Sequence, residues 1–377
     1  MKVLICTADL TKSGGVGQLF RTLQGKFDAD VDYFVVGSRG ENEGVAAAGL
    51  RIIADFIHFI VIVVRRRYDI VHINPSMNFK AVMRDGVLLL LAKALRSKVI
   101  IFFHGWDHTF SEAVTRHYLP LFRGVFLRAD AFIVLASSFK RKLVEMGVTK
   151  PIHLARTSVE DNLVSQISEY SLRTKLRNRR AAHTILFLSR IEKGKGIYEA
   201  LDAFALLRQR RPEARMDIVG DGAELAGAME YVGLKEIHGV RFFGHLSGAA
   251  KYDRFRDGDI YFLPTHSEGM PISVLEAMAA GIPVVTRPVG GIPDFFQNGK
   301  MGFLSESFEP KILAGFLERL LSDAKLREEV ALHNFRFARR EFTADLAAHQ
   351  LNSLYRSLQE SEDLAPGWAP SYESRVA

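Results

Sequence analysis

The chain contains very little cysteine, with Cys6 as the single one among 377 residues. One cysteine excludes an intrachain disulfide, and it therefore excludes the class of small secreted domains that disulfides hold together. Cys6 lies in the first apolar run, so we expect it to pack as a small hydrophobic residue of a strand. This cysteine usage fits a reducing cytoplasm.

The sequence also offers no segment that we expect to be a secretory signal or a membrane span. The first apolar stretch ends at Asp9, too early for a secretory signal, so we expect a cytoplasmic protein. The most apolar stretch, Phe56–Val64, is too short to span a bilayer, and Asp55 and His58 interrupt it. We interpret it as a buried helix that ends in Arg65-Arg66-Arg67, three cations that complement the helix dipole.

A dinucleotide-binding motif is missing as well. The glycine turn Gly14-Gly15-Val16-Gly17 lacks the G-x-G-x-x-G spacing, so it predicts only a sharp turn from a strand into a helix. Asp257-Gly258-Asp259 looks like an acidic metal-binding motif. It ends a predicted helix and begins a predicted strand, so we expect no metal there.

Negative charge is scarce in the first part of the chain. Up to Arg156 there are 22 lysines and arginines against 13 aspartates and glutamates, whereas the remainder has 28 against 30. A basic first half indicates an anionic partner. Because no nucleic-acid recognition motif is present, we expect peripheral contact with an anionic membrane, or a lipid-phosphate acceptor, and no nucleic acid.

What the sequence does have is a regular alternation of apolar strands with helices. This alternation is typical of α/β proteins with parallel sheets. The length exceeds what one hydrophobic core usually serves, so we expect two domains. The predicted strands are Val3–Cys6, Val31–Val36, Ile70–Ile73, Val99–Phe103, Ala131–Leu135 and Ile152–Leu154, and then Ile185–Leu188, Met216–Val219, Arg241–Phe243 and Ile260–Leu263, with one further strand after the helix that starts near Pro271.

The pattern restarts after a polar, basic segment, Glu160–Ala182, where we place a linker and a connecting helix. This predicts one domain over residues 1–160 and a second over 183–345. Residues 346–377 are predicted to hold a last helix and then a loosely held tail, because few apolar residues follow Gln359.

Two carboxylates, Glu268 and Glu276, flank a predicted helix start in the second domain. Pro271 suits the first position of that helix. The N–H groups of Ile272 to Val274 should be unpaired there, which favours an anion such as a diphosphate. Since carboxylates repel phosphate, the two acids fit better as acceptors for sugar or ribose hydroxyls.

Three segments around these acids, Ser267–Pro271, Glu276–Val285 and Gly290–Asp294, closely resemble the E-x7-E signature of the retaining glycosyltransferases of the GT-B fold, family 4. The resemblance implies two Rossmann-like domains that face each other across a cleft. It also implies transfer of a hexosyl group from a UDP-sugar or GDP-sugar to a glycan or lipid-linked acceptor, as in bacterial surface polysaccharide or lipopolysaccharide biosynthesis. Such enzymes generally need no metal and no cofactor, and they work in the cytoplasm or at the inner face of the membrane.

The resemblance also implies roles for individual residues. Glu268 would contact the donor sugar and Glu276 the ribose. Arg190 and Lys195 match the family's two cations, which stabilise the charge on the leaving diphosphate. His104 matches the histidine that faces the donor sugar, and His108 is the second candidate. The other implied donor-binding positions are Gly14, Gly15, Gly220, Leu246, Gly269, Met270, Pro271, Ile272, Ser273 and Val274.

One segment departs from the family pattern. Where many relatives have a Pro-Asn-Gly-Val-Asp turn, this chain has Ala155–Glu160, so the contacts made there are open. Two other functions also remain open. A nucleotide-sugar 2-epimerase shares the architecture, and a non-catalytic nucleotide-sugar binding protein would keep Glu276 but lose the two cations.

Overall fold

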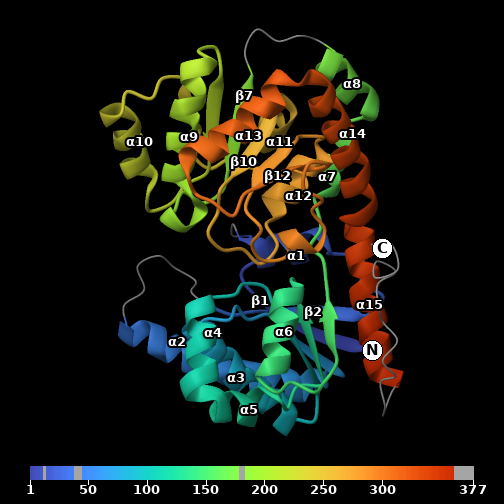
Figure 1. Ribbon diagram of the computed structural model, residues 1–377. Helices are drawn as coiled ribbons and strands as arrows, with labels where there is room; N and C mark the ends of the chain where they lie inside the picture. The colour runs from blue at the N-terminus through green and yellow to red at the C-terminus, as the bar shows by residue number, and fades with distance from the viewer. Residues whose placement is uncertain (12–13, 38–44, 178–182, 361–377) are drawn as a thin grey trace. The chain divides into compact units, whose positions relative to one another are not determined.

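The computed structural model describes residues 1–11, 14–37, 45–177 and 183–360. They form two compact units, each built on a parallel six-stranded sheet with helices on both faces (Figure 1). The N-terminal unit consists of Met1–Arg156 together with the chain from Asp345 onward, and the C-terminal unit is Thr157–Ala344. The predicted α/β class is confirmed.

The sheet of the N-terminal unit has the strand order β2-β1-β3-β4-β5-β6. Its strands are apolar over most of their length, as parallel strands covered on both faces must be. All six were predicted to within one residue at each end, and β2 is shifted by one residue toward the N-terminus. The strands are β1 (Lys2–Thr7), β2 (Asp30–Val35), β3 (Ile70–Ile73), β4 (Lys98–Phe103), β5 (Ala131–Val134) and β6 (Ile152–Leu154).

Two sets of helices cover this sheet. The helices α2, α3, α5 and α6 contribute to one apolar cluster with alternate strand residues such as Leu4 and Val71. On the other face Phe20 of α1 packs edge-on against His72, and α15, drawn in red in Figure 1, contacts the same histidine through Tyr355. The helices are α1 (Gly15–Thr22), α2 (Val45–Arg66), α3 (Phe79–Ala94), α4 (His108–Ala113), α5 (Leu119–Phe126), α6 (Ser137–Glu145) and α15 (Ala344–Glu360), with a π-helical turn at Val114–Tyr118.

The helix expected to be buried, α2, is mostly exposed. Phe59 and Val63 are buried against the sheet, but Leu50 is 71% and Ile57 is 57% exposed. The helix was predicted correctly and its burial was predicted wrongly. A crossover helix covers a sheet with one stripe only, so the apolar composition of the other stripe says nothing about what covers it.

The sheet of the C-terminal unit has the order β12-β11-β10-β7-β8-β9. A short last strand that the sequence did not predict, β12, extends one edge. The strands are β7 (Thr184–Leu188), β8 (Arg215–Val219), β9 (Val240–Phe242), β10 (Ile260–Leu263), β11 (Val284–Thr286) and β12 (Gly302–Leu304). The helices are α7 (Asp161–Gln166), α8 (Glu169–Arg177), α9 (Ile197–Arg210), α10 (Leu225–Leu234), α11 (Gly248–Asp257), α12 (Ile272–Ala279), α13 (Pro310–Ser322) and α14 (Ala324–Glu341).

The segments between and after the sheets are largely helical. Two short helices, α7 and α8, occupy the segment where we expected a linker and a connecting helix. From Pro310 to Glu360 the chain forms three helices, α13, α14 and α15, and at the first break Asp323 accepts a hydrogen bond from the N–H of Leu326. The tail predicted after Gln359 lies, from residue 361 on, outside the described residues.

A buried histidine in the N-terminal sheet predicts acid sensitivity. His72 is fully buried, and burial lowers its pKa to about 3. The unfolded chain binds a proton below about pH 6.5 and the folded chain does not, so stability should be complete above that pH and should be lost progressively as the pH falls toward 3.

The double variant His72→Phe/Tyr355→Phe removes the titrating ring together with its hydroxyl partner, which lies 2.7 Å away. We expect its melting temperature to fall less between pH 7 and pH 5 than that of the parent. His117→Gln, at an exposed position, is the control and should behave as the parent does. An equal fall in melting temperature in the parent and the double variant would contradict the assignment of the acid sensitivity to His72.

Candidate active site

The C-terminal sheet reverses its strand order between β10 and β7. The chain moves from β7 to β8 and β9 on one side, and β10, β11 and β12 continue on the other. At such a point the loops after the two central strands diverge, and ligands of open α/β sheets bind there, outside the carboxyl ends of the strands. The predicted donor-binding residues of this unit all follow the carboxyl ends of β7, β8, β9 and β10.

The two central loops meet through an ion pair. Lys195, at the end of a short 3-10 turn after β7, places its Nζ 2.7 Å from Oε1 of Glu268 in the loop after β10. The side chains are only 14% and 11% exposed. The structure therefore brings together two of the predicted site residues, and each neutralises the other.

Backbone contacts hold the surrounding loops close together. The N–H of His266 donates to the carbonyl of Gly194, and the N–H of Gly220, after β8, donates to the carbonyl of Gly244, after β9. Gly220 has a φ of 142°, and a Cβ there would lie 1.8 Å from the carbonyl oxygen of Ser189. Only glycine permits this approach, which explains the glycine at this position.

The helix beside the ion pair begins one residue later than predicted. Its first residue is Ile272, with Pro271 at the N-cap position. The expectation that the N–H groups of Ile272 to Val274 are all unpaired was wrong for Val274, because its N–H donates to the carbonyl of Pro271 at 3.1 Å. The hydroxyl of Ser273 lies 2.7 Å from that of Tyr261, which donates to the carbonyl of Leu188. Ser273 is thus tied to the central strands.

The second carboxylate, Glu276, is buried and paired with a lysine that the sequence did not single out. Its Oε1 lies 2.8 Å from Nζ of Lys251 on α11. The same Nζ lies 3.1 Å from Glu160, whose other oxygen accepts from the hydroxyl of Tyr252. Burial alone would lower the pKa of Lys251, but the two carboxylates outweigh burial and raise it. Lys251 is therefore charged, and it links Glu276 to the segment that departs from the family pattern.

Arg190 lies apart from this arrangement. Its side chain is 70% exposed, and its guanidinium contacts Glu192 at 2.6 Å on the surface of the loop after β7. The structure therefore fixes Lys195, and not Arg190, against the predicted sugar-binding carboxylate. Leu246 lies half-buried after β9, and Met270 is buried in the loop before α12.

The N-terminal sheet reverses its order between β1 and β3, and a second polar group lies at that point. Asn74, after β3, donates from its amide to the carbonyl of Cys6 at 2.9 Å. Its amide oxygen is therefore the atom 2.8 Å from Nε2 of His104, and the histidine nitrogen must donate to it. Burial lowers the pKa of His104 to about 3. His104 is thus neutral, with Nδ1 left as a hydrogen-bond acceptor.

The glycine turn lies at the same edge of the N-terminal sheet. Gly14 is the N-cap of α1 with a φ of 155°, and Gly15 begins the helix. A Cβ on either glycine would meet nothing within 4 Å. Steric crowding in this structure therefore does not explain why these two positions are glycine. His108 begins α4 and is exposed.

The acidic motif after α11 has structural contacts. Asp259 accepts from the N–H of Thr184 at 2.8 Å, and its pKa is lowered, because hydrogen bonds and the charges of His183 and Lys175 outweigh burial. Asp257 contacts Arg254 at 3.4 Å. Within residues 1–11, 14–37, 45–177 and 183–360, no group of three or more His, Cys, Asp or Glu could hold a metal ion.

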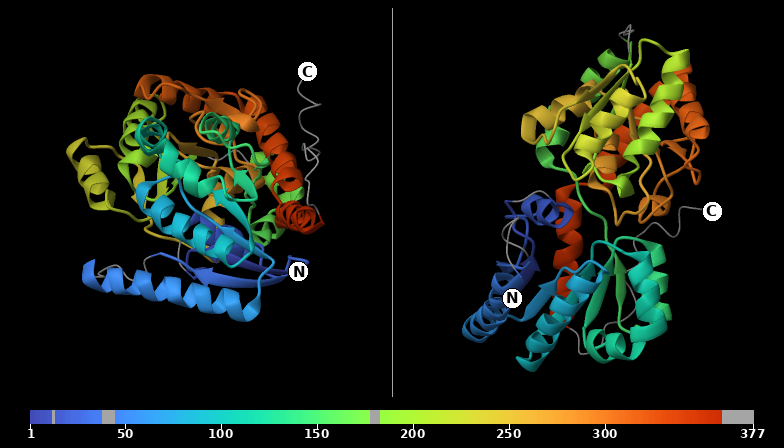
Figure 2. Two further views of the ribbon diagram at one scale, coloured as in Figure 1. Left: turned by 90° about the horizontal axis from the view of Figure 1, so that it is seen from below. Right: turned by 90° about the vertical axis from the view of Figure 1, so that its left-hand side faces the viewer.

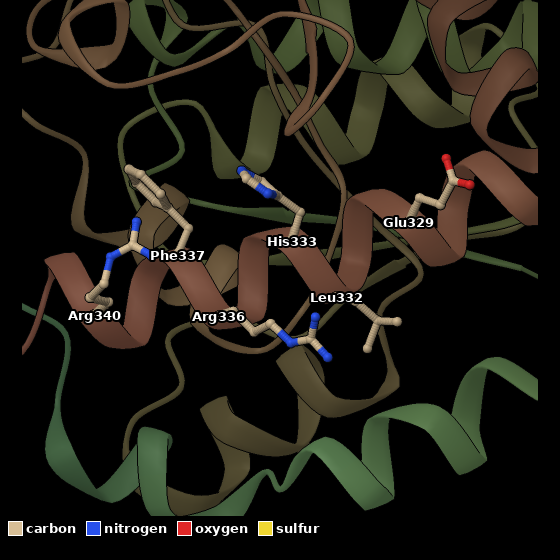
Figure 3. A pocket seen from close by; sticks show the side chains of 6 residues that line it. All are labelled: Glu329, Leu332, His333, Arg336, Phe337 and Arg340. Carbon is tan, nitrogen blue, oxygen red and sulfur yellow. The ribbon is translucent and has the colours of Figure 1, made fainter. Parts of the chain in front are cut away.

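A shallow hollow of about 410 Å³ lies away from these residues, along α14. Figure 3 shows that one helix supplies its lining, with Arg336 and His333 on different sides of the helix. Arg336 is ion-paired with Glu169 at 2.7 Å. The hollow therefore adds nothing to the site at the sheet edge.

Comparison with protein families decides the identity of the chain. The family model described as "Glycosyltransferase Family 4" matches residues 20–162, and that described as "Glycosyl transferases group 1" matches residues 170–332. The two models lie in succession over most of both units. The chain belongs to glycosyltransferase family 4.

Individual relatives of this glycosyltransferase are distant. The capsular polysaccharide biosynthesis glycosyltransferase CapM of Staphylococcus aureus is 25% identical over 62% of this chain and 63% of its own length. The putative colanic acid biosynthesis glycosyltransferase WcaL of Escherichia coli is 26% identical over 78% of this chain and 70% of its own. The matched part thus spans about two thirds of these relatives.

Solved structures show the same GT-B fold. Sucrose-phosphate synthase of Thermosynechococcus elongatus matches with a TM-score of 0.76 at 17% identity, over 95% of this chain and 99% of that one. HepE of Anabaena in complex with UDP-glucose matches with a TM-score of 0.70 at 18% identity, over 95% and 100% of the two chains.

Sequence reasoning did not single out three residues that contact the predicted site residues or their partners, namely Lys251, Glu160 and Asn74. Lys251 lies on a helix without a motif, and its two acidic partners are 25 and 91 residues away in the chain. No local pattern could have paired them. Asn74 follows an apolar strand at the sheet edge, and that position is a signal that could have been used.

We expect Lys251→Met to destabilise the C-terminal unit by about 3–5 kcal/mol, because it leaves two carboxylates next to each other without their shared cation. Thermal unfolding of the full chain measures the effect. Lys325→Met is the matched control, since this lysine is 87% exposed and 4.0 Å from its partner. Equal melting temperatures for the two variants would contradict a buried, charged Lys251.

Proposed function

We propose that this glycosyltransferase moves a hexosyl group from a nucleotide-diphosphate sugar, a UDP-sugar or a GDP-sugar, to a glycan or lipid-linked acceptor, with retention of anomeric configuration. The observation that carries the proposal is the Lys195–Glu268 pair, 2.7 Å apart at the reversal point of the C-terminal sheet, beside the amino end of α12. A cation, a helix amino end and an acceptor for hydroxyls are the groups that a diphosphate-linked sugar needs.

The chemical step needs charge stabilisation more than a strong base. Departure of the nucleoside diphosphate builds negative charge on its β-phosphate, and fixed cations lower the energy of that state. Lys195 supplies one fixed cation. Arg190, exposed earlier in the same loop, would have to leave Glu192 to supply a second. On this account the reaction needs no metal and no cofactor.

The two carboxylates, Glu268 and Glu276, have different roles in this proposal. Glu276 would accept from the ribose hydroxyls, with Lys251 holding its carboxylate in place. Glu268 would accept from hydroxyls of the sugar, with Gly269, Met270 and the first turn of α12 beside the diphosphate. Both acids act as oriented acceptors, which suits a reaction that depends on positioning.

In the N-terminal unit His104 would contact the sugar. Because its Nε2 donates to Asn74, the neutral ring offers Nδ1 as an acceptor for a hydroxyl. The hydrogen bond to Asn74 occupies the N–H of the ring, so His104 is not placed to donate a proton to the substrate. Gly14 and Gly15, at the same edge, would let backbone approach the donor.

Several comparisons support the wider setting. Relatives named for capsular polysaccharide, colanic acid and amylovoran biosynthesis favour a role in bacterial surface polysaccharide or lipopolysaccharide assembly. HepE was crystallised with UDP-glucose, which favours a nucleotide-sugar donor here. The excess of basic residues in the N-terminal part fits peripheral contact with an anionic membrane at its cytoplasmic face.

The proposal predicts slow hydrolysis of the donor when no acceptor is present. We expect Lys195→Ala to lower that rate by about 10²-fold or more, because it removes charge stabilisation from the leaving group. Lys193→Ala is the matched control, because this lysine is two residues away and 77% exposed, and it should leave the rate unchanged. Similar losses in the two variants would count against a specific role for Lys195.

The same assay separates the alternatives. A binding protein would give no hydrolysis in any variant, and a 2-epimerase would interconvert free donor epimers, seen by NMR of the sugar. We expect Glu268→Gln to retain nucleotide binding and to lose hydrolysis, since the amide keeps the shape but loses the negative charge.

Nucleotide preference can be read from thermal shifts. We expect uridine or guanosine diphosphate to raise the melting temperature in proportion to its affinity, and adenosine diphosphate to do so less. The shift should shrink in Lys195→Ala and persist in Lys193→Ala. No shift with any of the three nucleotides would argue against a nucleotide-sugar donor.

A further inference from the structure

The outward stripe of α2 is a continuous apolar surface. Leu50, Ile53, Ile57, Ile60, Val61 and Val64 are exposed, and Leu50 is the most exposed of them at 71%. Their spacing of three, four or one residue keeps them on one side of the helix. The opposite side, with Phe59 and Val63, packs in the core. The helix is therefore apolar on both sides, although only one side has a partner within the described residues.

The neighbouring helix α3 extends this surface. Phe79, Met83, Val87 and Leu90 are exposed at intervals of four, four and three residues, so they also form one stripe. The two helices are in contact, and both cover the same face of the sheet. Figure 2 shows α2 as the long light-blue helix at the border of the N-terminal unit. An apolar surface that runs over two helices differs from the scattered apolar side chains of an ordinary surface.

The length of α2 does not make it a membrane span. Its segment Ala47–Arg66 is long and apolar enough to cross a bilayer by length and composition. However, α2 connects β2 to β3, which lie on either side of β1, and its inner stripe packs on that sheet. Crossing a bilayer would remove this stripe from the core. A helix in this position can meet a membrane only by lying along its surface.

Charges around the stripe favour an anionic surface. Each of the two helices has one acidic residue, and both are turned inward and paired: Asp55 with Arg51 at 3.1 Å, and Asp85 with Arg84 at 2.6 Å. No carboxylate of α2 or α3 is therefore exposed beside the apolar stripes in the described structure. Arg65 and Arg66 lie in the last turn of α2 and Arg67 follows it; all three are exposed, and Arg66 also lies 3.6 Å from Asp32.

The last of these arginines is held in an unusual backbone conformation. Arg67 has a φ of 53°, in the left-handed region where glycine is most easily accommodated. An arginine at this position keeps a third positive charge at the end of the stripe. Apolar side chains flanked by several cations match the two parts of an anionic lipid surface, its acyl chains and its phosphates.

We propose that the outward stripes of α2 and α3 are a docking surface for an anionic lipid bilayer, with Leu50, Ile53 and Ile57 inserted at the boundary of headgroups and acyl chains and the arginines at the lipid phosphates. The proposal deepens the membrane contact of the proposed function by assigning it to named residues. Docking in this way would hold the N-terminal unit against the lipid, where a lipid-linked acceptor is presented.

Sedimentation of the full chain with lipid vesicles tests the proposal. We expect binding to vesicles that contain phosphatidylglycerol, weaker binding to pure phosphatidylcholine, and a loss of roughly tenfold or more in Ile53→Ser/Ile57→Ser. Met229→Ser/Leu234→Ser is the matched control, because these α10 side chains of the C-terminal unit are 52% and 77% exposed. It should bind as the parent does.

A second pair of variants tests the charges. Arg65→Gln/Arg67→Gln should weaken binding to anionic vesicles and leave binding to neutral vesicles unchanged, whereas Lys311→Gln/Lys325→Gln, two exposed lysines of the C-terminal unit, should change neither. A tryptophan placed by Ile57→Trp should show a blue shift of its fluorescence when anionic vesicles are added. This fluorescence measurement does not depend on the serine variant, so the proposal can still be tested if that variant folds poorly.

Three outcomes would overturn the proposal: no binding of the parent to anionic vesicles, equal binding of the parent and the serine variant, or self-association without lipid that the serine variant abolishes. The last outcome would assign the stripes to a second copy of the chain. Donor hydrolysis in solution should be the same in all these variants. Its absence from the parent would refute the proposed function and leave the vesicle result standing.

Discussion

Parallel pairing of every strand is the constraint on which both units depend. It gathers all the carboxyl ends of a sheet at one edge, and the reversal of strand order opens that edge between two central strands. Lys195 and Glu268, 73 residues apart, meet there at 2.7 Å in the C-terminal unit. Asn74 and His104 meet at 2.8 Å in the corresponding place of the N-terminal unit. The site residues are thus brought together by topology and not by nearness in sequence.

The same constraint explains what could be predicted from the sequence. A strand covered on both faces must be apolar along its length, so runs such as Ile70–Ile73 and Ile260–Leu263 are visible as strands without any structure. The start of α12 was predicted because Pro271 fixes its own φ and lacks an N–H. The strand β12, Gly302–Leu304, was missed because three residues that begin with glycine give almost no strand signal.

What the sequence could not predict is of two kinds. Contacts between distant charges, as in the group Glu160, Lys251 and Glu276, depend on how α11 and α12 pack and leave no local pattern. Burial is the second kind. The apolar composition of α2 gave the helix correctly, but the same residues are found on a helix enclosed in a core and on one that offers a stripe to another surface. Only the sheet shows which side of α2 is covered.

The electrostatics of the C-terminal site explain how an anion could be bound at a place lined by acids. An isolated buried charge is costly, and a buried pair avoids most of that cost only while both partners are present. Lys195 and Glu268 form a part-buried pair of this kind, and Lys251 is shared by two carboxylates, so the site has little positive charge of its own. In the proposed reaction a diphosphate at the start of α12 draws Lys195 away from Glu268.

The same movement frees the carboxylate of Glu268 for hydroxyls of the sugar. In the proposed reaction, one ion pair would keep both groups neutralised and would release both when a ligand brings phosphate and sugar together. A free phosphate would engage the lysine but leave Glu268 buried without a partner, at a cost that the hydroxyls of a donor sugar would offset. Under the proposed function, the pairing would therefore favour the complete donor over its parts, and this selectivity would arise from desolvation.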